Sequence, residues 1–290
     1  MGKKASFGEE FSILPVDTLT VRNIWFPVME KKSYPEANPF ALNDKRTFFV
    51  SADSYVETPD SKVGYRDILS DSIILLNQLD PFLDRELMNR AVERIGKPLI
   101  PTMQGGNNFE VKNWGIESKS DTLVVASHIS ATKGIYLNYN RGTKGITVNK
   151  YELQSVFRHE LIHYRDKDKW DNYSKKSKFT YKDHADVYLE QMGYPEFKET
   201  SIEFQAQIIG NCILRYWNQA ENNNQNYQVL EEGLKKINEF SEQKNLKAKV
   251  GIKEVDFYGI PITIAVIITD KKGIKQSFLI KYKNLPTPND

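Results

Sequence analysis

Hydrophobic residues recur at helical spacing along much of the chain. Intervals of three or four residues between apolar side chains are typical of helices that bury one face. Leu69, Ile73, Leu76 and Leu79 form the first such series. The sequence predicts six helices, over about residues 65–79, 81–95, 150–164, 183–192, 195–219 and 227–241.

Shorter segments rich in β-branched and aromatic residues have the character of strands. Turn residues bound them, such as the Gly105-Gly106 pair and Gly142. The predicted strands cover residues 98–102, 122–127, 134–139, 248–257, 260–269 and 276–282. Together with the helices they predict an α+β fold.

Three segments of different character divide the chain. Residues 1–60 are rich in Pro, Asn and aromatic residues, and no fold is assigned to them. Residues 61–223 contain most of the helices and form the predicted main domain, which ends at an Asn-rich piece. Residues 224–290 predict an αβββ accessory unit, which either caps the main domain or recognises a partner; we favour the cap.

The charge balance narrows the class of partners. The 290 residues include 40 basic and 38 acidic ones, a net charge of +2, which gives no electrostatic case for a nucleic acid or a membrane. Cys212 is the only cysteine, so no intrachain disulfide can form, and its apolar helical surroundings indicate a core residue. The first residues lack the apolar run of a secretory signal. We therefore expect a cytoplasmic protein, or one delivered to another cytosol without a signal peptide.

The clearest chemical signal is His159-Glu160-Leu161-Ile162-His163, inside the predicted helix 150–164. Residues four apart lie one turn above each other on a helix, so both imidazoles can face one metal ion. Glu160 stands beside them, placed to take a proton from a metal-bound water. Two histidines at this spacing with an adjacent carboxylate predict a catalytic zinc site.

The two faces of this helix have different roles. Asn149 can cap its start, and Glu152 is placed to complete a capping box. The face with the histidines is expected to open on a cleft, because a separate apolar stripe is available for packing. That stripe consists of Leu153, Phe157, Leu161 and Tyr164.

A catalytic zinc ion usually takes three protein ligands and keeps one position open. The metzincin continuation has Gly three and His six residues after the second histidine, but Asp166 and Lys169 stand there. The preferred third ligand is Glu203, 40 positions after that histidine on the predicted helix 195–219. Gln207, one turn later, is placed to hold such a ligand by a hydrogen bond.

His184 is the alternative third ligand. It lies 21 positions after His163, and imidazole is a natural zinc ligand. Glu199 and Asp166 are further candidates. Spacing alone leaves these alternatives open.

The motif followed by Glu203 resembles the zincin metallopeptidases of the gluzincin type, over about residues 134–216. The resemblance implies that His159, His163 and Glu203 bind Zn²⁺ and that Glu160 is the general base.

The same resemblance implies that the strand 134–139 is the sheet edge along which an extended peptide lies. Gln207 stands where gluzincins often have Asp. With His184 as the third ligand the chain is more similar to the SprT-like proteases, although Ala185 stands where these often have Gly.

These observations predict a zinc-dependent endopeptidase with a zincin-like core, acting on a protein or peptide substrate. The donor that stabilises the oxyanion is open among Tyr181, Tyr188, His128 and Arg215. One alternative is a non-catalytic, zinc-stabilised binding module whose αβββ unit recognises the partner. Another is a protease delivered to a foreign cell as a toxin or effector.

Overall fold

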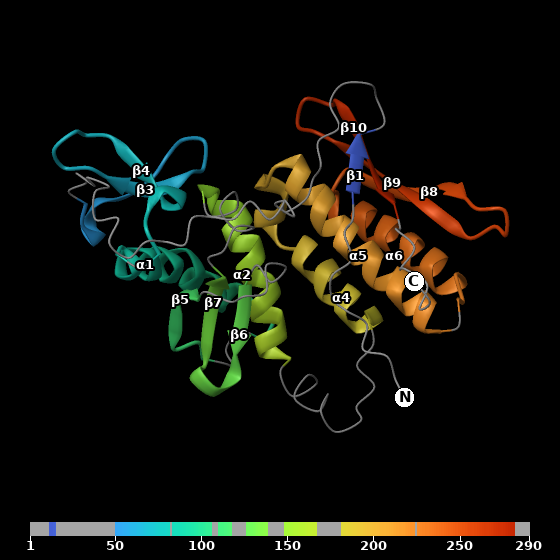
Figure 1. Ribbon diagram of the computed structural model, residues 1–290, viewed down its shortest axis with the longest axis horizontal. Coiled ribbons are helices and arrows are strands. Elements are labelled where there is room, and N and C mark those ends of the chain that lie inside the picture. The colour runs from blue at the N-terminus through green and yellow to red at the C-terminus, as the bar shows by residue number, and fades with distance from the viewer. Residues whose placement is uncertain are drawn as a thin grey trace, which may run out of the picture. The chain divides into compact units, whose positions relative to one another are not determined.

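The computed structural model describes most of the chain from residue 50 onwards. Its described residues form five α-helices and three small sheets, which confirms the predicted α+β class (Figure 1). Two compact units divide the chain: residues 26–160, and residues 1–25 together with 161–290. The described residues are 12–15, 50–81, 83–105, 110–117, 126–138, 148–166, 181–223 and 225–281.

The unit of residues 26–160 contains a small antiparallel sheet. Its strands, in spatial order, are β2 (Tyr55–Glu57), β3 (Val63–Arg66) and β4 (Ile73–Leu75). A short 3-10 helix (Leu76–Gln78) follows. The predicted helix over residues 65–79 is therefore wrong.

The turn between β3 and β4 explains this difference. The Asp67 carboxylate accepts a hydrogen bond from the backbone N–H of Leu69 at 2.9 Å, and Asp71 has a left-handed φ of 55°. Asp and Ser side chains in such turns compete with the hydrogen bonds of a helix. As a result Leu69, which the helical pattern places on a buried face, is 72% exposed.

A second sheet in the same unit has the order β5-β7-β6. β5 (Asn113–Glu117) runs parallel to the central strand β7 (Gly134–Asn138), and β6 (Ala126–Ile129) runs antiparallel to it. The strand predicted over residues 134–139 thus has a hydrogen-bonded neighbour on each side, and the expectation that it is an edge is wrong. Among the residues that the structure describes, the outer strands of this sheet are β5 and β6.

Two helices pack against this sheet through Trp114 of β5. The last residue of α1 (Arg85–Gly96) approaches it so closely that a β-carbon on Gly96 would lie 2.1 Å from the indole ring. α2 (Lys150–Arg165) places Phe157 edge-on to the same indole, with ring centroids 5.7 Å apart. The first part of α2 is therefore anchored on the sheet.

α1 confirms the predicted helix over residues 81–95, although the helix begins later, at Arg85. The residues after it form a 3-10 helix (Lys97–Thr102) where the sequence predicts a strand. Pro98 and Pro101 lie in this segment, and proline has no N–H to donate to a strand ladder.

In its described residues, the unit of residues 1–25 and 161–290 contains the last residues of α2 and three further helices. These are α4 (Tyr181–Met192), α5 (Ile202–Asn222) and α6 (Gln228–Lys244). A short 3-10 helix (Pro195–Glu199) precedes α5. The helices confirm the three predicted segments, although the helix predicted from residue 195 begins only at Ile202, after the 3-10 helix.

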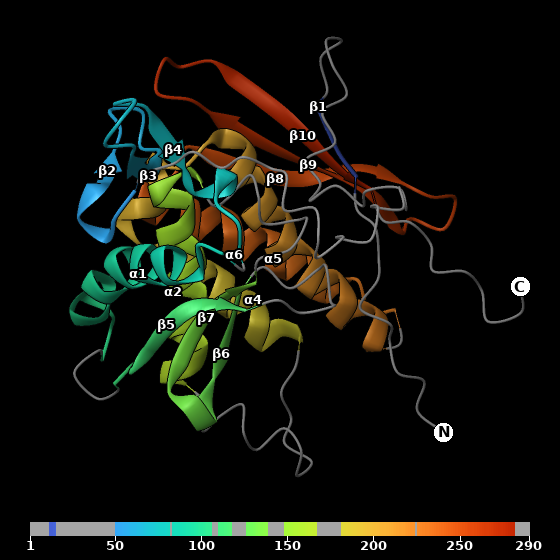
Figure 2. The ribbon, with the colours of Figure 1, turned by 60° about the vertical axis from the view of Figure 1, so that its left-hand side comes forward.

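The sheet of this unit is antiparallel and has the order β1-β10-β9-β8. α6 packs on β8 and α5 on β9, and Figure 2 shows both helices on one side of the sheet. The predicted C-terminal helix and three strands are present, and a strand from the start of the chain is added to them. The strands are β1 (Ser12–Pro15), β8 (Ala248–Val255), β9 (Pro261–Thr269) and β10 (Lys275–Lys281).

The core of this unit contains α5. Cys212 is fully buried and burial raises the pKa of its thiol, which confirms a core position. Gly233 of α6 lets the helices approach, because a β-carbon there would lie 2.3 Å from the Tyr216 ring. In the part of the chain that the structure describes, none of the helices has the length and apolar character that crossing a membrane requires.

Candidate metal centre

The helix that carries the motif begins at a capped residue. The Asn149 side chain accepts hydrogen bonds from the backbone N–H groups of Tyr151 and Glu152, at 2.9 and 3.2 Å. This cap satisfies two donors that the first turn of a helix leaves open. The predicted apolar stripe is buried along the helix, at Leu153, Phe157, Leu161 and Tyr164.

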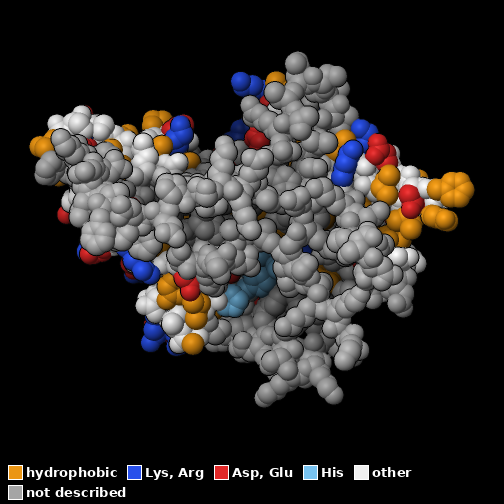
Figure 3. Space-filling view, viewed as in Figure 1, with side chains coloured by type: hydrophobic (Ala, Val, Ile, Leu, Met, Phe, Trp, Pro, Cys, Tyr) orange, Lys and Arg blue, Asp and Glu red, His pale blue; other side chains and the backbone are white. Residues whose placement is uncertain are grey.

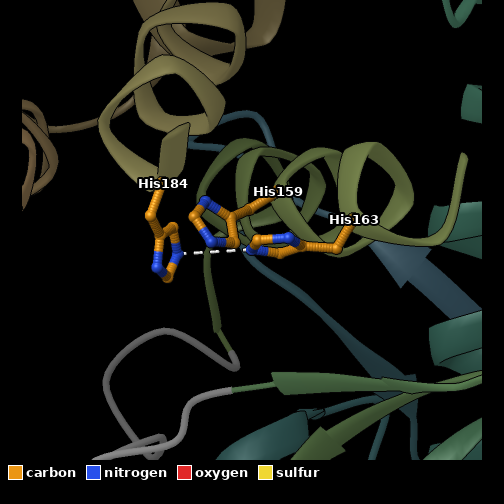
Figure 4. Close-up of side chains that lie close together, drawn as sticks. All are labelled: His159, His163 and His184. Carbon is orange, nitrogen blue, oxygen red and sulfur yellow. Dashed lines mark hydrogen bonds between the residues drawn. The ribbon is translucent and has the colours of Figure 1, made fainter. Parts of the chain in front are cut away.

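Three histidines converge where α2 meets α4. His159 and His163 lie one turn apart on α2, and His184 comes from the first turn of α4 (Figure 4). Their candidate ligand nitrogens all lie within 4.8 Å of one another. Among the described residues, these three side chains are the ones that come together in a group large enough and close enough to hold a metal ion.

The separation of two of these nitrogens matches metal coordination. The Nε2 atoms of His163 and His184 lie 3.2 Å apart. Two nitrogens at zinc–nitrogen bond lengths in a tetrahedral site would be about 3.3–3.4 Å apart. A direct hydrogen bond between the rings would instead require a proton on one Nε2 only. The residues present therefore fit a metal ion without rearrangement of this pair.

The ring of His184 is supported from one side. Tyr188, one turn later on α4, stacks on it with an interplanar angle of 12° and 5.2 Å between centroids. The ring of His163 meets His184 edge-on, at 76°. Histidine side chains are visible from the side drawn in Figure 3. Stacking on Tyr188 thus orients the His184 ring, while His163 is buried and His159 and His184 are partly exposed.

Glu160 follows His159 on α2 and is largely buried, with 9% of its surface exposed. Its Oε2 lies 3.5 Å from Nδ1 of His128, which is on the outer strand β6. A carboxylate beside the candidate ligand histidines, with an imidazole in contact, is suited to accept a proton and be held in place.

Glu203, the third ligand preferred from the sequence, does not belong to the histidine group. It lies in the first turn of α5, where Ser201 caps the helix by accepting a hydrogen bond from the N–H of Phe204 at 3.2 Å. His184, the alternative candidate, lies in the group because α4 brings its side chain to His163.

The remaining candidate ligands have other partners. Both carboxylate oxygens of Asp166 accept hydrogen bonds from Arg165, at 2.8 and 3.0 Å. The carboxylate of Glu199 accepts one from Lys271 at 2.6 Å. Asp166 and Glu199, which spacing alone leaves as candidate ligands, thus form ion pairs with basic side chains.

Sequence reasoning missed Arg158, the residue before His159. Its side chain is buried, at 2% exposure, and donates to the Leu99 carbonyl at 2.8 Å and to Thr102 Oγ1 at 2.6 Å. Arg158 thereby ties α2 to the 3-10 helix that follows α1. Nothing in the motif indicates this contact, because the partner is more than fifty positions away.

Comparisons with known proteins identified no relative of this chain. No family model matches the sequence, and neither a curated protein nor a solved structure shows significant similarity to it. The interpretation of the three histidines therefore rests on their own geometry and chemistry.

Proposed function

We propose that the protein is a zinc-dependent endopeptidase in which His159, His163 and His184 hold the ion and Glu160 is the general base. The sheet β5-β7-β6 with α1 and α2 is its zincin-like core. The observation that carries the proposal is the 3.2 Å separation between Nε2 of His163 and Nε2 of His184, completed by His159 within 4.8 Å.

Three imidazole ligands favour zinc as the metal, and the coordination position that they leave open favours a catalytic role. Three neutral imidazoles suit zinc among the common metals, and three protein ligands leave a coordination position open. A zinc ion held there would lower the pKa of a water toward about 7 and polarise a peptide carbonyl. A structural zinc site, in contrast, is usually closed by a fourth protein ligand.

Glu160 takes the proton of the attacking water in this proposal. Its position directly after His159 puts the carboxylate beside the ligands, and its burial excludes most bulk water. His128 contacts the carboxylate from β6 and limits the orientations that it can adopt. The proton then passes from Glu160 to the leaving amine, as general acid–base catalysis requires.

We expect the substrate to be an extended polypeptide beside β6. In the described residues, β6 is hydrogen-bonded to β7 on one side and has no neighbouring strand on the other. Strand edges bind extended peptides through backbone hydrogen bonds. Because His128 lies on β6 and contacts Glu160, a peptide along this strand passes close to the general base.

The test compares Glu160→Gln with Glu152→Gln, a matched change on the same helix, and with wild type. Each zinc-loaded protein is incubated with unfolded casein and with a peptide library from a whole-cell digest, and new N-termini are identified by mass spectrometry. We expect wild type and Glu152→Gln to cleave, and Glu160→Gln to bind zinc but leave the peptides intact.

Two results would count against the proposal. Cleavage by Glu160→Gln at the wild-type rate would remove Glu160 from the chemistry. A wild-type protein that binds one zinc ion tightly but yields no new N-termini in either substrate would favour the non-catalytic binding module instead.

A further inference from the structure

We propose that Arg165 and Glu190 position His184 for metal binding by clamping the end of α2 to α4. The inference rests on the proposed metal centre and assigns it two positioning residues. Together with Asp166 and Tyr194 they form a network that we call the Arg165 clasp. None of the four side chains belongs to the histidine group itself.

The geometry of the clasp fixes orientation as well as distance. Arg165 Nη1 donates to Glu190 Oε1 at 2.6 Å, and Nη2 donates to Oε2 at 2.9 Å. A planar guanidinium that meets a carboxylate with two parallel hydrogen bonds allows little rotation between the partners. A single point charge such as a lysine ammonium would not impose this restriction.

Further hydrogen bonds hold both members of the pair. Asp166 accepts from Arg165 Nε at 2.8 Å, and the Tyr194 hydroxyl donates to Glu190 Oε1 at 3.0 Å. The side chains of Arg165, Asp166 and Glu190 are only 17, 20 and 23% exposed. Charges in such a partly buried setting are costly unless paired, and here the pairing is extensive.

The place of the clasp links it to the metal ligands. Arg165 comes two residues after His163 on α2, and Glu190 comes six residues after His184 on α4. Six helical residues span about 9 Å, so the clasp holds α4 near the ligand without touching it. Tyr188 lies between these positions and stacks on the His184 ring. The clasp thus fixes the position of α4, and Tyr188 fixes the orientation of the His184 ring.

Metal binding is sensitive to such positioning. Ligand atoms have to lie within a few tenths of an ångström of their ideal places, because metal–nitrogen bonds are short and directional. The 3.2 Å separation between the Nε2 atoms of His163 and His184 depends on how α4 lies against the end of α2. Residues that hold ligands in place typically contribute roughly 10–100-fold to metal affinity.

The structure offers a matched control on α4. Asp186 of α4 accepts from Lys236 of α6 at 2.5 Å, in an ion pair that does not involve α2. Lys236→Met removes an ion pair of the same helix without changing the clasp. If the clasp itself supports metal binding, Lys236→Met should keep the zinc affinity of the wild-type protein.

The experiment measures zinc dissociation constants by chelator competition and the visible absorption of the Co²⁺-loaded proteins. The proteins are wild type, Arg165→Lys, Glu190→Gln, Tyr194→Phe and Lys236→Met. Urea unfolding of each metal-free protein is measured alongside. We expect Arg165→Lys and Glu190→Gln to weaken zinc binding about 10-fold or more, with altered Co²⁺ bands. Tyr194→Phe should have a smaller effect in the same direction, and Lys236→Met none.

The outcomes separate the clasp from the proposed function. Wild-type affinity and unchanged Co²⁺ spectra in Arg165→Lys, Glu190→Gln and Tyr194→Phe would overturn the clasp and leave the metal centre intact. An equal loss in Lys236→Met would also overturn it, because the effect would then be general destabilisation. A wild-type protein that binds neither Zn²⁺ nor Co²⁺ would overturn the metal centre and the clasp together.

Discussion

The imidazole of His128 lies against the carboxylate of Glu160, with 3.5 Å between Nδ1 and Oε2. His128 is on β6, whereas Glu160 is on α2. At this distance the contact is weaker than an ideal hydrogen bond, yet it restricts the carboxylate because both groups are largely enclosed. His128 is thereby placed to hold the proposed general base without binding the metal.

From this contact we expect His128→Ala to lower kcat about 10-fold while zinc content stays at one ion per chain, since groups that orient a reacting residue contribute at about this level. Ser127→Ala, on the same strand, is the control and should cleave at the wild-type rate. The measurement is the rate of peptide cleavage together with elemental analysis. Loss of zinc from His128→Ala would show that it supports the metal instead.

His184→Ala and Glu203→Ala test the identity of the third ligand. Zinc at 100 times its dissociation constant should stabilise the wild-type protein by about 2.7 kcal/mol. We expect this stabilisation to persist in Glu203→Ala and to be largely lost in His184→Ala, because only His184 lies beside His163. Urea unfolding with and without zinc measures it. The opposite pattern would make Glu203 the ligand, as the spacing favours.

Substitutions of Tyr188 separate stacking from the hydroxyl group. Tyr188→Phe retains an aromatic ring against His184 and should keep wild-type zinc affinity. Tyr188→Leu removes the stacked ring, so His184 gains rotational freedom and zinc binding should weaken about 10-fold. Chelator competition measures both. A Tyr188→Phe variant that binds zinc normally but cleaves more slowly would indicate that the hydroxyl contacts the substrate.

Arg158→Met should destabilise the protein by about 2 kcal/mol, because it removes two hydrogen bonds that a charged guanidinium donates, to the Leu99 carbonyl and to Thr102 Oγ1. Lys97→Met is the control. It breaks an exposed ion pair with Glu93, and such pairs contribute less than about 1 kcal/mol. The free energy of unfolding in urea, measured on the metal-free protein, distinguishes the two. An equal loss of unfolding free energy in Arg158→Met and Lys97→Met would contradict the role of Arg158 as an anchor of α2.

Tyr65 gives a prediction at alkaline pH. Burial raises its pKa to about 12, against the opposing effect of Arg90 and Arg94, and its hydroxyl donates to the Leu87 carbonyl at 2.6 Å. An unfolded tyrosine loses its proton near pH 10. The folded chain retains the proton longer, so this contribution to stability is complete below pH 10 and is lost as the pH rises toward 12.

Absorbance at 295 nm follows tyrosine ionisation, and urea unfolding at several pH values follows stability. The fall in stability above pH 10 should be smaller in Tyr65→Phe than in wild type. An identical pH dependence in the two proteins would contradict the assignment to Tyr65.

The sequence predicted long helices better than short elements. The apolar stripe from Leu153 to Tyr164 spans several turns, and local periodicity alone defines α2. The segment 65–79 shows a similar spacing, but the turn around Asp67 and Asp71 made it a hairpin. A pattern of a few apolar residues fits either structure, and the neighbours that select one are distant in sequence. For the same reason, the sequence could not show that β7 is a central strand, because its neighbours β5 and β6 are assigned only by the tertiary structure.

The sequence by itself determined the part of the candidate metal site that lies within one helix. Four residues of separation fix the relative positions of His159 and His163, because helical geometry is local. The third ligand, the contact of His128 with Glu160 and the Arg165 clasp depend on segments that meet only after folding. The packing of α4 brings His184, and not Glu203, into the group with His159 and His163, and no spacing along the chain encodes that packing.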